Sequence, residues 1–258
     1  MEAINAKPVE QHLIEIRANK AAWARKPLLH AIYSNFYKLI RENFSGTPGL
    51  VVELGSGIGS IKEVIPECIT TDVFANPWID RRENAYALTF ADGCLSNLVL
   101  LDVFHHLKYP GTALREFRRV LRPGGRVILL EPGMGMLGRA LYALFHHEPL
   151  GLSDKITWFA PENFNPEENG YYAAQANASR VFLLNDFSER LSAWRLIKVQ
   201  QLPEIAYVAS GGFSKRQLYP DFVLPLIRRV EKILKAWPQF FATRLLVVLE
   251  KPIASEVK

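Results

Sequence analysis

Cysteine is scarce in this chain, whose 258 residues include only Cys68 and Cys94. Both lie in apolar surroundings, and their spacing is not that of zinc ligands. They are therefore predicted to be reduced thiols of the core, and the sequence predicts neither a disulfide nor a metal site.

Long apolar runs are also absent. No stretch of about 18 uninterrupted apolar residues occurs, and the opening MEAINAKPVEQHLIE is polar where a secretion signal needs an apolar run. A cytoplasmic protein is the expectation. Hydrophobic residues still make up 49% of the chain, which is enough for a sizeable core.

The excess of positive charge is small, at a net +5. It permits an anionic partner without requiring one. Arg115, Arg118, Arg119 and Arg122 share one face of a predicted helix, and we interpret this stripe as a solvated outer face. Nucleic acid is not the expected partner.

Short apolar runs alternate with helical patterns along the chain. The predicted strands are LVVEL (50–54), CITTD (68–72), LSNLVLLD (95–102), RVILLE (126–131), WRLIKVQQL (194–202) and ATRLLVVLEK (242–251). Strands that alternate with helices indicate an α/β protein with a largely parallel sheet. Residues 1–45 are predicted to be a helical lead-in and 46–258 the main domain, with insertions near 132–180 and 210–240 capping the carboxyl edge of the sheet.

Glycines follow the first strand in VVELGSGIGS, where Gly55, Gly57 and Gly59 come just after Glu53. Such a turn lets a ligand approach the main chain closely. A dinucleotide site has the spacing G-x-G-x-x-G, which needs a third glycine at the position of Ser60. A pyrophosphate also repels a carboxylate, so Glu53 favours a cationic ligand instead.

The segments E-L-G-S-G-I-G and LDVFHHLKYPGTALREFRRVLRPGGRVILLEP (101–132), with Asp72 between them, resemble the class I S-adenosylmethionine-dependent methyltransferases of the methyltransferase-11 type. The resemblance spans roughly residues 50–132. It implies a Rossmann-like, mostly parallel seven-stranded sheet with flanking helices and a helical cap, and S-adenosylmethionine as the cofactor. NASRVF and SGGF carry a weaker similarity to methyltransferases found with bacterial surface-polysaccharide enzymes.

The resemblance also implies roles for the residues of the glycine turn. Gly55, Ser56, Gly57 and Gly59 would line the methionine part of the cofactor, and Glu53 would bind its ammonium group.

Later residues would hold the rest of the cofactor. Asp72 would accept hydrogen bonds from the ribose hydroxyls, and Val73 would also contact the cofactor. Asn84 and Ala85 would contact the adenine, and Asp102 would form a pocket wall. Asn84 stands where the family usually has an acid, and the short link from Asp72 to Asn84 leaves little room for the usual helix.

Methyl transfer from a sulfonium mainly requires that donor and acceptor be aligned. His105 and His106 follow the fourth predicted strand, where α/β sheets place ligands. We hypothesise that one of them is a general base; the alternative is a histidine that anchors a loop or lines the pocket. Glu131 and the cluster His146, His147 and Glu148 are weaker candidates.

The acceptor is predicted by exclusion. DVFHHL stands where methyltransferases of nucleobase amines have a [DNS]-P-P-[YF] motif. An oxygen or nitrogen atom of a small-molecule, glycan or lipid-linked acceptor is therefore favoured. The alternatives are a non-catalytic, cofactor-binding interaction protein of the same fold and, supported only by the basic balance, an RNA methyltransferase.

The stretch FVLPLIRRVEKILKAW (222–237) interleaves apolar and basic residues. Two interpretations fit: a cap helix that packs its apolar side on the sheet, which we favour, and a helix that makes peripheral membrane contact.

Overall fold

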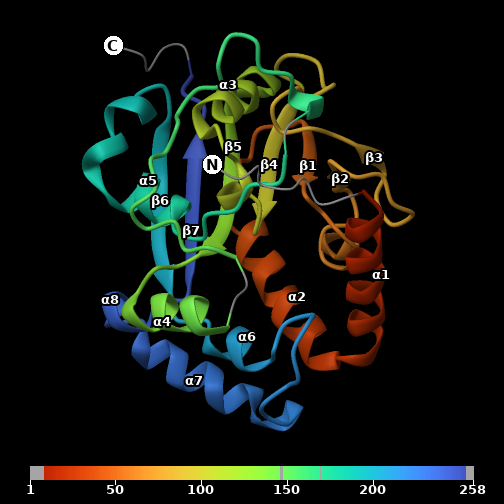
Figure 1. Cartoon of the computed structure of the whole chain (residues 1–258), viewed down its shortest axis with the longest axis vertical. Coiled ribbons are helices and arrows are strands. Elements are labelled where there is room, and N and C mark those ends of the chain that lie inside the picture. Colours follow the sequence, from red (N-terminus) through yellow and green to blue (C-terminus); the bar gives the residue numbers. More distant parts are fainter. Residues whose placement is uncertain (1–8, 146–147, 169, 254–258) are drawn as a thin grey trace.

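A computed structural model describes residues 9–145, 148–168 and 170–253, so the histidine pair at 146–147 lies outside the described residues. The strands of the described chain form one seven-stranded sheet in the order β3-β2-β1-β4-β5-β7-β6 (Figure 1). The strands are β1 Leu50–Leu54, β2 Ile69–Asp72, β3 Arg81–Arg82, β4 Leu95–Leu101, β5 Leu121–Pro132, β6 Arg195–Leu202 and β7 Arg244–Glu250. The strands β3, β2, β1, β4 and β5 run parallel to one another. Strand β7 is antiparallel to both of its neighbours, β5 and β6, so β6 runs in the same direction as β5. The predicted Rossmann-like, mostly parallel α/β fold is confirmed.

Helices flank both faces of this sheet. The α-helices are α1 Val9–Arg25, α2 Pro27–Arg41, α3 Pro110–Val120, α4 Met136–Phe145, α5 Asn177–Leu183, α6 Ile205–Ala209, α7 Leu224–Leu234 and α8 Pro238–Phe241. Short 3-10 helices are η1 Ser60–Glu63, η2 Phe104–His106, η3 Pro166–Glu168, η4 Asn185–Phe187, η5 Glu189–Leu191 and η6 Asp221–Val223. Proline at the first position of α2 and α3 fits each helix start, since that position needs no backbone donor.

The core has two halves because side chains alternate across a strand. On β4, Leu98 and Leu100 face the cluster that includes α3 and α5. Val99 and Leu101 point to the other face, into the cluster that includes α2. The central strands are buried on both faces, which explains why they read as continuous apolar runs.

Three local details differ from the regular pattern. The segment after the glycine turn forms only the four-residue 3-10 helix η1, because Pro66 follows closely and disfavours a helical residue before it. RPGG (122–125) is a bulge within β5 rather than a separate turn, since the register with β4 shifts there. Between Asp72 and Asn84 lies only the two-residue strand β3, which confirms that no helix joins them.

The carboxyl ends of the parallel strands are covered. Figure 1 shows α4, α6 and α7 grouped at the end of the sheet toward which the arrow of β4 points. No helix in the described part of the chain has the length and apolar character needed to cross a membrane. The turns after β1, β2, β4 and β5 lie at the carboxyl ends of these strands, where the functional side chains of an α/β sheet are expected.

Candidate active site

The glycine turn after β1 has a backbone that other residues adopt only with strain. Gly55, Gly57 and Gly59 have φ angles of 67°, 53° and 68°, in the left-handed region that favours glycine. A Cβ on Gly55 would lie 2.4 Å from a methyl carbon of Val103, and one on Gly59 would lie 2.3 Å from the carbonyl oxygen of Trp78. Packing thus requires two of the glycines.

Glu53 lies in β1, directly before this turn, and is only 1% exposed. Its Oε2 has no hydrogen-bond partner among the described residues. Burial raises the pKa of Glu53 to about 8. A buried carboxyl group without a full set of partners costs stability, and a bound cation would relieve that cost.

Ser56 fastens the turn to the neighbouring strand. Its hydroxyl donates to the main-chain carbonyl of Glu53 over 3.1 Å and accepts the N–H of Thr71 over 3.0 Å. The Ser56 side chain is therefore engaged within the protein. Any contact with the cofactor would come from its main chain.

Asp72 ends β2, beside the turn. Its two carboxylate oxygens accept the N–H groups of Gly57 and Phe74, each over 3.1 Å. Burial raises its pKa, although these hydrogen bonds oppose the shift. Since β1 and β2 are parallel neighbours, Glu53 and Asp72 lie at the same edge of the sheet. Val73, the next residue, is 40% exposed.

Helix α1 covers this region, which the sequence did not predict. His12 Nε2 lies 3.9 Å from Asp72 Oδ1, and its ring lies 4.2 Å from that of Phe74. Ile16 is buried, and its Cδ1 is 3.7 Å from the Cβ position of Gly57. The N-terminal helix thus forms one wall of the candidate cofactor site.

The residues predicted to contact adenine form a tight local turn. Asn84 Oδ1 accepts the N–H of Tyr86, and Nδ2 donates to the carbonyl of Pro166, each over 3.0 Å. Ala85 is partly buried against the core. The Asn84 amide is thus held in a fixed orientation that keeps its oxygen beside the Tyr86 N–H.

The turn after β4 contains Asp102, which pairs with an arginine of the last strand, β7. Asp102, predicted to be a pocket wall, has a φ of 58° and forms a bidentate ion pair with Arg244, with 2.8 Å between Nη2 and Oδ2. Arg244 is 1% exposed, and its guanidinium lies 4.3 Å from the centre of the Tyr207 ring. Sequence reasoning missed Arg244; its signal was a charged residue at the start of an apolar strand.

The two predicted catalytic histidines lie in η2. Glu131 Oε1 accepts the N–H groups of Val103 and Phe104, and Oε2 lies 2.7 Å from His105 Nδ1. Burial alone would lower the pKa of His105, but the Glu131 carboxylate outweighs it and raises that pKa to about 10. A histidine held in this way is poorly suited to accept a proton at neutral pH.

His106 differs from its neighbour. Its Nδ1 lies 2.9 Å from the carbonyl oxygen of Tyr172. Burial and the adjacent His105 lower the pKa of His106 to about 4. Glu148, one of the weaker sequence candidates, lies beside both rings.

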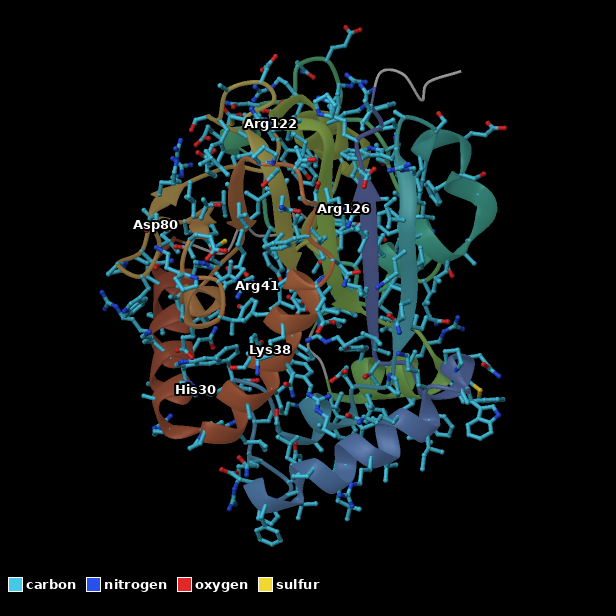
Figure 2. The ribbon with its side chains drawn as sticks, turned by 180° about the vertical axis from the view of Figure 1, so that it is seen from behind. His30, Lys38, Arg41, Asp80, Arg122 and Arg126 are labelled. Atoms are coloured by element: carbon cyan, nitrogen blue, oxygen red, sulfur yellow. The ribbon has the colours of Figure 1, made fainter. Side chains whose placement is uncertain are left out.

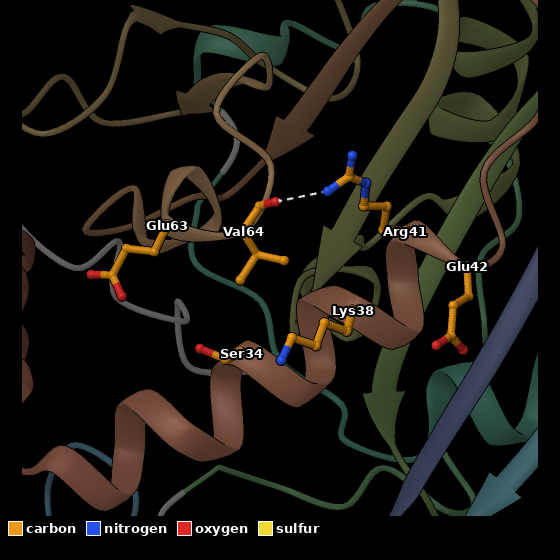
Figure 3. A pocket seen from close by; sticks show the side chains of 6 residues that line it. All are labelled: Ser34, Lys38, Arg41, Glu42, Glu63 and Val64. Atoms are coloured by element: carbon orange, nitrogen blue, oxygen red, sulfur yellow. Dashed lines mark hydrogen bonds between the residues drawn. The ribbon is translucent and has the colours of Figure 1, made fainter.

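Two surface hollows lie outside these residues. One, of about 690 Å³, lies between α2 and η1 and is lined by Ser34, Lys38, Arg41, Glu42, Glu63 and Val64 (Figure 3). Arg41 donates across it to the carbonyl of Val64 over 3.3 Å. None of the predicted site residues lines it. The other, of about 620 Å³, is apolar and is lined by Met136, Leu137, Leu234, Trp237, Phe240 and Phe241.

Residues 53–129 match the family model described as a methyltransferase domain. This segment carries the glycine turn, Asp72 and the turn after β4, and it is a methyltransferase domain. Its cofactor is S-adenosylmethionine, and the protein is a methyltransferase enzyme. No curated protein matches the chain.

Solved structures share the fold of this methyltransferase. A S-adenosylmethionine-dependent methyltransferase from Archaeoglobus fulgidus is 14% identical, with 86% of this chain and 94% of that one covered and a TM-score of 0.50. Geranyl diphosphate C-methyltransferase from Streptomyces coelicolor A3(2), in complex with Mg²⁺, geranyl diphosphate and S-adenosyl-L-homocysteine, is 9% identical, with 86% and 81% covered and a TM-score of 0.50.

Proposed function

We propose that this methyltransferase binds its cofactor at the turn after β1 and transfers the methyl group to an oxygen or nitrogen atom of a lipid-linked acceptor. When bound, S-adenosylmethionine supplies an electrophilic methyl group on a sulfonium. Its ammonium group would meet Glu53, and its ribose hydroxyls would meet Asp72 and Val73. The backbone of Gly55, Ser56, Gly57 and Gly59 would lie against its methionine part.

The observation that carries the cofactor placement is the buried Oε2 of Glu53, which lacks a partner among the described residues. A buried acceptor at the base of a glycine turn fits an ammonium group, because the cation supplies the missing donors. Asn84 and Ala85 remain the proposed adenine contacts. Asp102 would act only as a wall, since Arg244 engages its carboxylate.

The proposed lipid-linked acceptor rests on the surface of α7. Leu226, Val230 and Ile233 follow one another at helical spacing and are 60%, 43% and 64% exposed. Exposed basic residues lie among them, including Lys232 and Lys235. The apolar hollow adjoins this stripe, because Leu234 lines it. An apolar face with basic residues fits an anionic lipid surface.

The predicted basic stripe supports no competing function in RNA methylation. The prediction of one helix face was wrong for Arg122, which lies in β5, because α3 ends at Val120. Arg119 pairs with Glu116 and Asp92, and Arg122 donates to main-chain carbonyls, including that of Gly93. Figure 2 places Arg122 at the end of the sheet far from α7. These guanidinium groups are engaged within the protein rather than presented as a phosphate-binding row.

Co-sedimentation with vesicles tests the lipid proposal. Vesicles of phosphatidylcholine with phosphatidylglycerol should pellet the protein, and the pair Leu226→Ser and Ile233→Ser should abolish this. Leu196→Ser is the matched control, since Leu196 is 47% exposed on β6. Release of S-adenosylhomocysteine should then be stimulated by a lipid extract and not by water-soluble glycans. A wild-type protein that stays in the supernatant would overturn the lipid-surface proposal.

A further inference from the structure

Three side chains from two distant segments converge beside η2. His105 Nε2 lies 3.6 Å from Glu148 Oε2, and His106 Nε2 lies 3.9 Å from Glu148 Oε1. One ligand atom from each of the three residues lies within 4.8 Å of the other two. These separations are too long for good hydrogen bonds. They match atoms that share one ion, which lie about 3 to 4 Å apart when each is about 2.0 to 2.2 Å from the metal.

The other nitrogen of each ring is already held by an acceptor. Glu131 Oε2 lies 2.7 Å from His105 Nδ1, and the carbonyl of Tyr172 lies 2.9 Å from His106 Nδ1. With the Nδ1 proton held by these acceptors, a metal ion would displace the proton from Nε2 and bind the lone pair that faces Glu148. A carboxylate or a main-chain carbonyl behind the ring is the usual support of a histidine that binds a metal.

Glu148 is supported in the same manner. The hydroxyl of Tyr171 and the side-chain amide of Gln175 both donate to its carboxylate. The side chains of His105 and Glu148 are 3% and 9% exposed, whereas that of His106 is 33% exposed. The cluster is therefore oriented from behind and open to solvent on one side.

We propose that His105 Nε2, His106 Nε2 and the Glu148 carboxylate bind one divalent transition-metal ion such as Zn²⁺. Two imidazoles and one carboxylate are a common ligand set for zinc and non-haem iron, and they leave a position for an outside ligand. A metal ion bound to Nε2 would occupy the position at which a general base takes up a proton. This site was not predicted from the sequence, because only the spacing of cysteine ligands was considered there.

The proposed metal site is linked to the proposed cofactor turn through Val103. The segment that carries both histidines begins at Val103, whose methyl group packs against Gly55. An oxygen of the acceptor would fill the open metal position. That role rests on the proposed function, whereas metal binding itself does not.

The test is a titration of the purified full chain after dialysis against a chelator. Calorimetry with Zn²⁺ should show one site per chain, and Co²⁺ should give the visible absorption of a protein-bound ion. Glu148→Gln and His106→Ala should each weaken binding at least about a hundredfold, and Glu131→Gln about ten- to hundredfold. Thermal melts verify that each variant is folded.

His30→Ala is the matched control. His30 lies on α2, 3.3 Å from Glu63, and Figure 2 labels it there. Metal affinity should be unchanged in this variant. A wild type that binds neither ion, or binding that survives both Glu148→Gln and His106→Ala, would overturn the metal site. Measuring S-adenosylhomocysteine binding by the metal-free wild type separates that failure from a failure of the cofactor site.

Discussion

The turns after β1 and β4 lie side by side at one edge of the sheet, yet they handle charge in opposite ways. After β1, Glu53 is buried with one oxygen unpartnered. After β4, Asp102 is paired with the buried Arg244, and Glu131 accepts several donors of η2.

The charge in the turn after β4 is compensated by other residues of the protein, whereas the turn after β1 leaves an acceptor that a ligand can pair with. Desolvation of a charge is tolerated when a partner compensates it. The β4 turn obtains its partners from β5 and β7, so it is stable as it stands. The β1 turn lacks a compensating cation among the described residues, which fits the ammonium group of the cofactor.

The largest expected effect comes from breaking the completed turn. Arg244→Met leaves Asp102 without its cation and removes a buried guanidinium that packs on Tyr207. Because the Asp102 side chain is 29% exposed, we expect a loss of about 3 kcal/mol in the free energy of unfolding, the lower end of the range for breaking a buried pair. Urea denaturation measures this loss. The control is Arg82→Met, because Arg82 and Glu167 form an exposed pair that contributes about 0 to 1 kcal/mol. Equal losses in the two variants would contradict the contrast.

Replacing Glu53 beside the turn after β1 should instead increase the free energy of unfolding. The folded pKa of Glu53 is about 8, above its ordinary value of 4.5. Stability contributed by this group is therefore fully present below pH 4.5 and is lost as the pH rises to about 8. Glu53→Gln removes that loss, so without cofactor it should be more stable than the wild type at pH 8, by on the order of 2 to 4 kcal/mol.

Urea denaturation at pH 5 and pH 8 measures this difference. The two proteins should be nearly equal at pH 5. Affinity for S-adenosylhomocysteine should meanwhile fall in Glu53→Gln, because the ammonium loses its counter-charge. Wild-type and variant stabilities that follow the same course with pH would contradict the buried, unpartnered state of Glu53.

A smaller effect distinguishes a strained turn from a ligand-binding turn. Gly57 and Gly93 have similar φ angles of 53° and 61°, and neither is crowded at its Cβ position. Alanine should cost about 1 kcal/mol of stability at either position. Only Gly57→Ala should also weaken S-adenosylhomocysteine binding, by about tenfold, or about 1.4 kcal/mol. Calorimetry tests this, and equal affinities for both variants would place the ligand elsewhere.

The sequence predicted what is encoded within short segments. Alternating apolar runs predicted the sheet, and the glycines with Glu53 predicted the turn, since both depend on neighbours in the chain. The role of Asp72 came from the family resemblance, which includes an acid at the end of a strand.

Contacts between distant segments could not be predicted in the same way. Arg244 reaches Asp102 from the last strand, His12 reaches Asp72 from the first helix, and Glu148 reaches His105 from a loop. Each depends on how separate elements pack, and no local pattern records that packing. The hypothesis that His105 or His106 is a general base stays a prediction. The Glu131 carboxylate that lies against His105 was recognised in the sequence only as a weak candidate.

The central claim, that the cofactor binds at the turn after β1, is tested most directly by calorimetric titration with S-adenosylhomocysteine. The wild type should bind one molecule per chain. Asp72→Ala should weaken binding about ten- to hundredfold, equal to about 1.5 to 3 kcal/mol, while Asp92→Ala, which alters an exposed carboxylate paired with Arg119, should bind like the wild type. A wild type that does not bind, or an Asp72→Ala variant with unchanged affinity, would contradict it.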